Sequence, residues 1–303
     1  MGQWIQHLMF LVYLISSSMN IFGNRMLVPG SSVDQLLLII LWIQILVSLI
    51  FLGFLFLKDR KKYEFDLNES MGYIPSSISF CSRCFFSYKL INVCSFSSIC
   101  IFTNFRIICT SLLSYFLFGE SLKLIHNVFF IIIILTVLLY VYQENHMDMI
   151  TFLLSMSVSI HHSLYIVFAR RRDEKKDMNI IVSCFYTFLG AFIIMTLLVI
   201  IEISSFSLLL DLNFYHLLYT CGFAVINNIV QTSIVISNTP LVLSCLSSLK
   251  YIVLAMIDNE DFSKLKLILL AIILFVNLYF VVTTPSSQNE HSSSSFQPLI
   301  DSK

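Results

Sequence analysis

Residues 102–142 read FTNFRIICTSLLSYFLFGESLKLIHNVFFIIIILTVLLYVY, and this stretch decides the fold. It belongs to two long apolar segments, at about 96–118 and 122–142, which a short acidic turn separates. Each segment is close to the roughly 20 apolar residues that a helix needs to cross a bilayer. The apolar runs are continuous rather than alternating, which is typical of membrane-spanning helices and not of barrel strands. Arg106 lies about ten residues into the first segment.

The same pattern continues along the whole chain of 303 residues, of which 57% are hydrophobic and 12% charged. Soluble domains average about 45–50% apolar and about 25% charged residues, so this composition indicates an integral membrane protein. We expect an all-α, polytopic transmembrane domain over 1–283 and a polar, Ser-rich, disordered tail over 284–303. About ten candidate spans lie at roughly 8–28, 36–57, 75–92, 96–118, 122–142, 149–169, 179–201, 214–236, 240–257 and 264–283.

Basic residues predict the orientation, because cytosolic loops carry the excess of Lys and Arg. Clusters of cations follow the second span at 58–62 and the sixth span at 170–176, whereas the loops on the other side are poorer in them. Lys264 and Lys266 run against this trend. The majority places both termini in the cytosol, which requires an even number of helices. The glycosylation sequon at 68–70 would then face the cytosol, and we expect it to be unused.

A second stretch, residues 245–282, reads CLSSLKYIVLAMIDNEDFSKLKLILLAIILFVNLYFVV and has the same order of features. In both stretches a cation-bearing helix leads through an acidic turn to a nearly pure aliphatic helix. Five predicted helices separate the two copies, so they enter the membrane from opposite sides. Inverted repeats are typical of transporters whose site lies at the midplane between the halves. We expect two inverted five-helix repeats, at about 8–142 and 149–283; the alternative is chance similarity between apolar stretches.

Arg106 and Lys250 each lie about ten residues into a span, and no acid lies inside any span to neutralise them. A cation at the bilayer centre costs about 2.5–3.5 kcal/mol on insertion scales, and such residues usually face a protein-lined cavity. The missing anion is therefore expected to be a ligand, such as a phosphate or pyrophosphate. The alternative is that each cation bonds backbone carbonyls or snorkels to an interface. For Arg83 and Lys89, snorkelling to an interface is as good an explanation as a bound ligand, because we expect both to fall close to the ends of the third span.

Other polar and aromatic side chains in the spans are weaker candidates. An aromatic pair in the seventh span could stack on a base, although packing accounts for it as well. The amides could bond a ligand or a neighbouring helix. The histidine pair in the sixth span is better explained by packing than by proton relay. These residues are Phe185 and Tyr186, then Asn104, Asn227 and Asn228, and finally His161 and His162.

Several classes of function are disfavoured by what the spans do not contain. Proton or sodium coupling usually uses intramembrane carboxylates, and none lies at mid-depth, so exchange of anions or passive facilitation is favoured. ATP-driven pumping is not expected without a Walker loop, nor nucleic-acid binding without a basic face. An enzyme is not expected either, because the spans contain neither paired carboxylates nor a nucleophile with its base. Cys81 and Cys84 form a CxxC without a second pair, so we expect no metal and no cofactor.

Three segments resemble nucleotide-sugar transporters of the drug/metabolite transporter superfamily, closest to the GDP-mannose and UDP-sugar branches. The segment 97–120 is similar to a family helix with an F-T-x-x-R pattern, which Phe102, Thr103 and Arg106 match. The segment 237–253 is similar to the helix that carries GALNK in GDP-mannose carriers, and Lys250 falls on the motif's Lys.

The resemblance has departures at both recognition motifs. Leu246 and Leu249 replace the Gly and the Asn of GALNK. Phe185 and Tyr186 match the start of the carriers' FYNN motif, while its two Asn are replaced by Thr187 and Phe188. The replacements leave the identity of the base open, because the amides that would read the base edge are gone.

The resemblance implies ten helices with cytosolic termini in a Golgi or endoplasmic reticulum membrane. It also implies alternating access, with a nucleotide sugar exchanged for its nucleoside monophosphate, and a homodimer is possible. It assigns base contact to the FYNN-like pair and phosphate or sugar contact to the Lys. The candidate substrate-binding residues are Arg106, Lys250, Phe185, Tyr186, Asn104 and Ser247. Two alternatives stay open: a carrier of another phosphorylated organic anion such as triose phosphate, and a non-transport membrane protein such as a receptor or scaffold.

Overall fold

The computed structural model describes residues 3–27, 33–58, 65–119, 124–144, 149–174, 179–201, 213–258 and 263–283. The structure is 94% helical, and no strand is present in these ranges, which confirms the predicted all-α class. The predicted tail at 284–303 lies outside the described residues.

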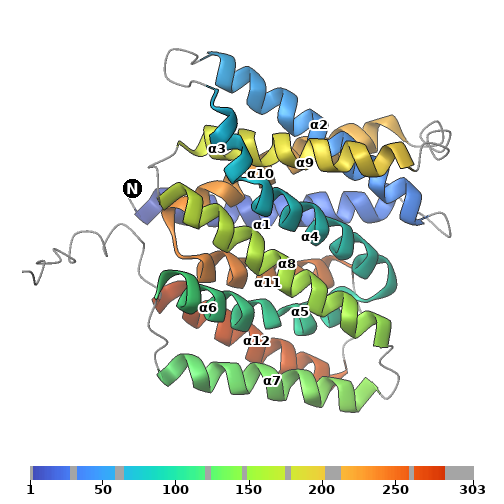
Figure 1. The fold of residues 1–303 in the computed structure, drawn as a ribbon. Coiled ribbons are helices and arrows are strands. Elements are labelled where there is room, and N and C mark those ends of the chain that lie inside the picture. Colours follow the sequence, from blue (N-terminus) through green and yellow to red (C-terminus); the bar gives the residue numbers. More distant parts are fainter. Residues whose placement is uncertain are drawn as a thin grey trace, which may run out of the picture.

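Figure 1 shows a bundle of long helices that run roughly parallel or antiparallel to one another. The helices in chain order are α1 (Gln3–Leu27), α2 (Val33–Lys58), α3 (Leu67–Gly72), α4 (Ile74–Val93), α5 (Phe96–Thr103), α6 (Phe105–Phe118), α7 (Leu124–Glu144), α8 (Met149–Glu174), α9 (Ile180–Ile201), α10 (Phe214–Ser237), α11 (Pro240–Ile257) and α12 (Lys264–Thr283).

Nine helical segments in the described ranges are long and apolar enough to cross a membrane, with α5 and α6 counted together as one. The chain is therefore a multi-pass membrane protein. The helix α4 has 20 residues but is not among the nine. Its sequence carries five serines, Arg83 and Lys89, which lower its hydropathy. It nevertheless packs along α8 and α9 inside the bundle.

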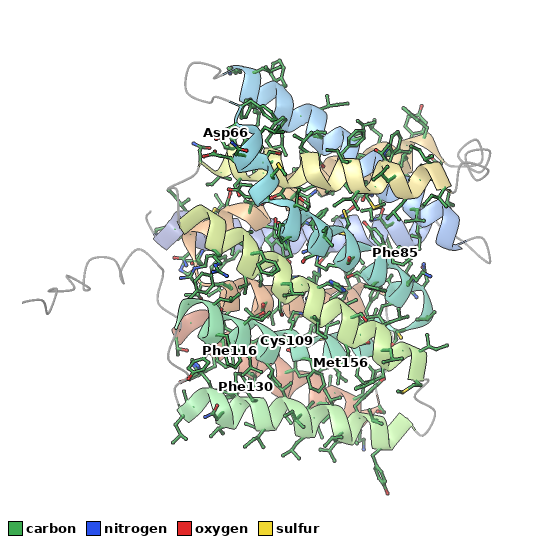
Figure 2. All side chains as sticks on the ribbon, in the orientation of Figure 1. Asp66, Phe85, Cys109, Phe116, Phe130 and Met156 are labelled. Atoms are coloured by element: carbon green, nitrogen blue, oxygen red, sulfur yellow. The ribbon has the colours of Figure 1, made fainter. Side chains whose placement is uncertain are left out.

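The helices differ in how much of their surface faces outward. The helix α11 is the most buried of the apolar spans, whereas α7 and α12 are among the least buried. Figure 2 shows the apolar side chains of α7 projecting from the edge of the bundle. Exposed Leu, Ile and Phe side chains are expected where lipid replaces water as the solvent. The helix α11 thus lies in the interior of the bundle, and α7 and α12 lie at its periphery.

The most extensive packing between helices joins the first half of the chain to the second half. We call α1–α7 the first half and α8–α12 the second half. The helix α4 packs extensively against α8, α1 against α10, and α2 against α9. The start of α1 and the end of α12 lie at the same end of the bundle (Figure 1).

The expected continuous span at 96–118 is divided in the structure. It consists of α5 and α6, which Asn104 separates. The helix α6 ends at Gly119, whose φ of 70° is left-handed and suits a residue without Cβ. The sequon at 68–70 lies in the short helix α3, whose N-cap Asp66 accepts bonds from the backbone N–H groups of Asn68 and Glu69.

Candidate functional site

A pocket lies inside the bundle, with about 660 Å³ of space that includes its opening to solvent. Both halves contribute to its wall, through α1, α2, α4 and α6 and through α8, α10 and α11. The lining residues are Ser17, Asn20, Ile21, Leu41, Gln44, Ile45, Phe80, Arg83, Cys84, Ser87, Tyr88, Ile91, Arg106, Val158, His162, Ala224, Asn227, Asn228, Lys250 and Tyr251.

Three cations meet at this pocket: Arg83 from α4, Arg106 from α6 and Lys250 from α11. No Asp or Glu is among its lining residues in the described part of the chain. Two of the six candidate residues, Arg106 and Lys250, therefore lie at one pocket despite 144 positions between them in the sequence numbering.

Arg106 is held by the interruption between α5 and α6. The N–H of Ile107 donates to the carbonyl of Asn104, three residues back, at 3.0 Å. The carbonyl of Thr103 accepts instead from Nε of Arg106 at 2.7 Å. The guanidinium thus caps a carbonyl at the helix break, which fixes its direction. Its side chain is only 2% exposed, and Nη2 has no hydrogen-bond partner among the described residues.

Arg83 is the tenth residue of α4 and so lies at mid-helix. The expectation that it falls near a helix end was wrong, because α4 extends about ten residues to either side of it. Its guanidinium lies 4.9 Å from the ring centroids of both Phe80 and Tyr165, which are favourable cation–π contacts. Nη1 of Arg83 lies 3.4 Å from Nδ1 of His162.

The contact with Arg83 defines the chemistry of His162. Arginine can only donate, so Nδ1 of His162 accepts and the proton of the neutral ring is on Nε2. That Nε2 is buried and has no partner among the described residues. Arg106 and His162 therefore each present a buried donor without an acceptor at the pocket.

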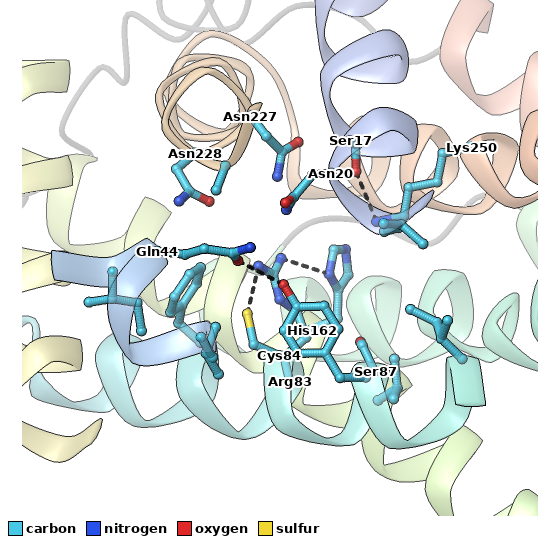
Figure 3. Close-up of a pocket in the computed structure, with 18 of the residues that line it drawn as sticks. Ser17, Asn20, Gln44, Arg83, Cys84, Ser87, His162, Asn227, Asn228 and Lys250 are labelled. Atoms are coloured by element: carbon cyan, nitrogen blue, oxygen red, sulfur yellow. Dashed lines mark hydrogen bonds between the residues drawn. The ribbon is translucent and has the colours of Figure 1, made fainter. Parts of the chain in front are cut away.

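Lys250 reaches the pocket from α11, near the centre of that helix. Its Nζ donates to Oγ of Ser17 on α1 at 3.1 Å and lies 5.1 Å from the ring centroid of Tyr251. The same ring lies 5.7 Å from Cζ of Arg106. Figure 3 shows Lys250 and Ser17 on one side of the pocket, and Gln44 and Asn228 on the other. Neutral oxygen and ring contacts leave the ammonium charge without an opposite charge.

Amide side chains line the other side of the pocket. Gln44 on α2 donates to Oδ1 of Asn24 at 2.7 Å and accepts from the hydroxyl of Tyr88 at 3.0 Å. Asn24 in turn donates to the oxygens of Tyr88 and Asn20 at 2.7 and 3.2 Å. This closed network ties α1, α2 and α4 together. Asn227 and Asn228 on α10 complete the polar wall.

Hydroxyl bonds hold the helices behind the cations. Oγ1 of Thr110 on α6 donates to Oγ of Ser163 on α8 at 2.9 Å and lies 2.7 Å from Oγ of Ser244 on α11. Ser163 also donates to the backbone oxygen of Arg106 at 3.1 Å. Small hydroxyl residues allow close helix approach and bond across helices in membranes. They fix the backbone of the cation-bearing helices.

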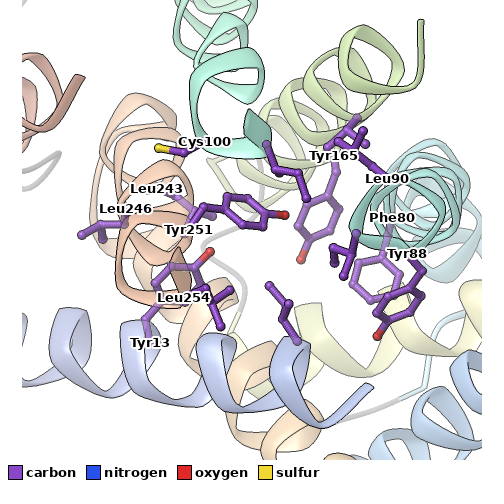
Figure 4. Close-up of a cluster of buried hydrophobic side chains, with 14 of the residues drawn as sticks. Tyr13, Phe80, Tyr88, Leu90, Cys100, Tyr165, Leu243, Leu246, Tyr251 and Leu254 are labelled. Carbon is purple, nitrogen blue, oxygen red and sulfur yellow. The ribbon is translucent and has the colours of Figure 1, made fainter. Parts of the chain in front are cut away.

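Buried aromatic side chains surround the polar interior (Figure 4). Tyr165 and Tyr251 lie on facing sides of one interior space in that view, and Phe80 packs beside Tyr165 with ring centroids 5.4 Å apart. The rings shield the guanidinium groups from lipid while still meeting them with their faces.

Ser247 and Asn104 lie next to the pocket as structural residues rather than in its lining. Oγ of Ser247 lies 2.6 Å from the hydroxyl of Tyr13, which joins α11 to α1. Oδ1 of Asn104 accepts from Nδ2 of Asn277 on α12 at 2.9 Å. Both side chains are fully buried.

Phe185 and Tyr186 lie away from the pocket in a separate cluster with Phe56 and Tyr73. The ring of Phe185 stacks on that of Phe56 with centroids 4.8 Å apart. The hydroxyl of Tyr186 accepts from the N–H of Asp66 at 2.9 Å. The structure does not bring this pair together with the cations.

The residues at the two motif departures are packing residues. Oγ1 of Thr187 lies 3.4 Å from Oγ of Ser76, and the ring of Phe188 packs edge-on against that of Phe80. Leu246 and Leu249 belong to the main buried core. In the described ranges, no group of three or more metal-ligating side chains is present.

Sequence reasoning missed Gln44 and Asn20, left Arg83, Asn227 and Asn228 undecided as pocket residues, and assigned His162 to packing. One signal was available: each is polar in an otherwise apolar helix. The chain matches no family model and no curated protein.

Proposed function

We propose that the protein is a membrane carrier for a phosphorylated organic anion of the nucleotide-sugar class. The observation that supports it most is the convergence of Arg83, Arg106 and Lys250 on a pocket with no carboxylate in its described lining. Three uncompensated charges in a bilayer interior are costly. An anionic ligand supplies the missing opposite charge.

The unpaired donors favour a ligand rich in acceptors. Nη2 of Arg106 and Nε2 of His162 are buried without partners in the described part of the chain. A buried donor left unbonded costs about 1–3 kcal/mol, and more when the group is charged. Phosphate oxygens accept several charge-assisted hydrogen bonds at once. A phosphate or diphosphate group at these donors satisfies both.

The packing of the helices supports an inverted repeat and alternating access. In an inverted repeat, α1 corresponds to α8 and α4 corresponds to α10. The packing of α4 on α8 then has a counterpart in the packing of α10 on α1. The packing of α2 on α9 is its own counterpart. In this scheme α4 also crosses the membrane and raises the number of spans in the described ranges from nine to ten. Arg106 and Lys250 then occupy corresponding helices, and the pocket lies between the halves as in repeat-built transporters.

The charge pattern favours exchange over a one-way leak. An empty pocket holds like charges that repel one another when the halves close around it. A bound anion removes this repulsion, so the loaded carrier changes its access more readily than the empty one. A nucleotide sugar entering from the cytosol and a nucleoside monophosphate returning fit this scheme. We place such a carrier in a Golgi or endoplasmic reticulum membrane, with both termini cytosolic.

The test is uptake into proteoliposomes that contain the purified protein. Vesicles preloaded with UMP, GMP, CMP or AMP are given labelled nucleotide sugars, and the expected result is uptake that one of the monophosphates stimulates from inside. Arg106→Gln and Lys250→Gln are expected to lower uptake at least about tenfold, since a bond to a charged group contributes about 1.5–3 kcal/mol. Lys89→Gln is the matched control, because Lys89 lies on α4 outside the pocket.

The outcomes separate the alternatives. Uptake of triose phosphate or phosphoenolpyruvate instead of nucleotide sugars would assign the same pocket to a smaller anion. Normal uptake by both pocket variants, or no binding of any phosphorylated compound, would remove the proposed function.

A further inference from the structure

The pocket has two chemically different sides. Lys250 marks one side, and the amides of Asn20, Gln44, Asn227 and Asn228 gather on the other (Figure 3). These amides come from three helices, α1, α2 and α10. A ligand that fills the pocket therefore meets the ammonium of Lys250 on one side and amide donors and acceptors, with Arg83 close to them, on the other.

The amides differ in how much of their bonding capacity is already used. Both ends of the Gln44 amide are occupied, by Asn24 and by Tyr88. Asn228 makes one long contact, with Nδ2 3.5 Å from Oγ of Ser48. Asn227 is 8% exposed, and its Oδ1 is fully buried without a partner in the described residues. Gln44 is thus a fixed wall, whereas Asn227 is available to bond a ligand.

A buried amide without a partner at the edge of a pocket is explained when the ligand completes it. An amide both donates and accepts, and so do the edges of nucleobases and the hydroxyls of sugars. A fully ionised phosphate group offers acceptors only, whereas a base or a sugar also offers N–H or O–H donors to Oδ1 of Asn227. The open acceptor therefore favours a ligand that extends beyond its charged group.

We propose that Asn227, supported by the neighbouring amides of Asn20 and Asn228, forms a subsite for the neutral, hydrogen-bonding part of the transported anion. This inference rests on the proposed function, because it needs the phosphate to lie against Arg106 and Lys250. The neutral part is a nucleobase or a sugar, and both share the required donors and acceptors. Asn227 then determines specificity, while the cations determine affinity for the phosphate.

The experiment compares four probes on Asn227→Leu, which keeps the volume and removes the amide. Inhibition constants against labelled substrate are measured in proteoliposomes for inorganic pyrophosphate, UMP, GMP and UDP-glucose. Gln231→Leu is the matched control, because Gln231 is buried one turn further along α10 and does not line the pocket. Arg106→Gln is measured beside it as the phosphate-side variant.

The expected result is that Asn227→Leu weakens UDP-glucose at least about tenfold and leaves pyrophosphate unchanged. Weakening of a monophosphate by the same factor would assign the subsite to the base; an unchanged monophosphate would assign it to the sugar. Arg106→Gln should weaken all four probes. Unchanged inhibition by every probe on Asn227→Leu, or equal weakening that includes pyrophosphate, would overturn the subsite. If no probe binds the wild-type protein, the proposed function itself fails, which is a different result.

Discussion

Nη1 of Arg25, at the end of α1, lies 2.7 Å from Oδ2 of Asp258, which caps the end of α11. This ion pair joins the first half to the second. Cζ of Arg25 also lies 4.6 Å from the ring centroid of Phe96 at the start of α5. The two charged side chains are 37% and 30% exposed. Such pairs contribute only about 0–1 kcal/mol, so this one adds little to stability.

Breaking the Arg25–Asp258 pair is expected to change the rate of exchange by up to about fivefold, which corresponds to about 1 kcal/mol. Arg25→Asp alone places two acids together and should give the larger change. Arg25→Asp combined with Asp258→Arg should recover most of the wild-type rate. The measurement is initial uptake into preloaded proteoliposomes. A double variant no better than the single one would show that the pair has no part in the cycle.

Removal of the Arg106 charge is expected to separate stability from binding. A buried charge without an opposite charge is costly, and Arg106→Met removes that cost. Arg106→Met should therefore melt at the same or a higher temperature without ligand. Wild-type protein at a hundredfold excess of ligand over Kd should gain about 2.7 kcal/mol, and the variant should lose this gain. Thermal melts in detergent with and without the transported anion test both parts.

Cys84 offers a direct probe of the pocket, because it is half-buried, lines the cavity and lies 3.7 Å from Nη2 of Arg83. A small anionic thiol reagent should reach it, drawn by the neighbouring cations, and block uptake. Substrate should slow this inactivation, and Cys84→Ser should abolish it. Inactivation that persists in Cys84→Ser would assign the reactive thiol elsewhere.

Close packing between α1 and α10 depends on Gly23. A Cβ added there would lie 2.5 Å from Cγ2 of Thr220, closer than van der Waals contact allows. Gly23→Ala should therefore destabilise the protein by about 1–3 kcal/mol. Thr220→Ser removes that methyl group and keeps the hydroxyl, which donates to the carbonyl of Leu217 at 2.9 Å. The double variant should regain most of the lost melting temperature.

The bond between Asn104 and Asn277 holds the helix break against α12. Polar pairs inside membrane proteins contribute about 0.6 kcal/mol on average and up to about 1.7 kcal/mol. We expect a coupling energy in this range from a double-mutant cycle of Asn104→Leu and Asn277→Leu, read from unfolding in bicelles. Additive effects of the two substitutions would contradict the pairing.

Hydropathy alone was enough to predict an all-α membrane protein and the positions of most helices. Composition determines these features, since each span must satisfy its own backbone in lipid. Arg106 and Lys250 could be selected for the same reason, because a lone cation in a span is conspicuous in the sequence.

The break at Asn104 has no signature in the hydropathy of the span, and the bond of Asn104 with Asn277 joins residues 173 positions apart in the chain. Arg83 was wrongly assigned to a helix end, although the predicted span at 75–92 agrees with α4 to one residue at each end and position 83 is central in both. Phe185 and Tyr186 were chosen on a motif, yet their surroundings are set by Phe56 and Asp66 from distant segments. Long-range contacts of this kind leave no periodic trace in the sequence.

The guanidinium of Arg106 holds one backbone acceptor and leaves another donor open. Nε donates to the carbonyl of Thr103 at the break between α5 and α6, while Nη2 has no partner among the described residues. Because Nε and Nη2 belong to one rigid plane, a rotation that turns Nη2 toward a phosphate also changes the bond of Nε to that carbonyl. In the proposed carrier, an anion bound at Nη2 would therefore act directly on the backbone between α5 and α6, so that ligand binding and the shape of this helix pair would be coupled through one side chain.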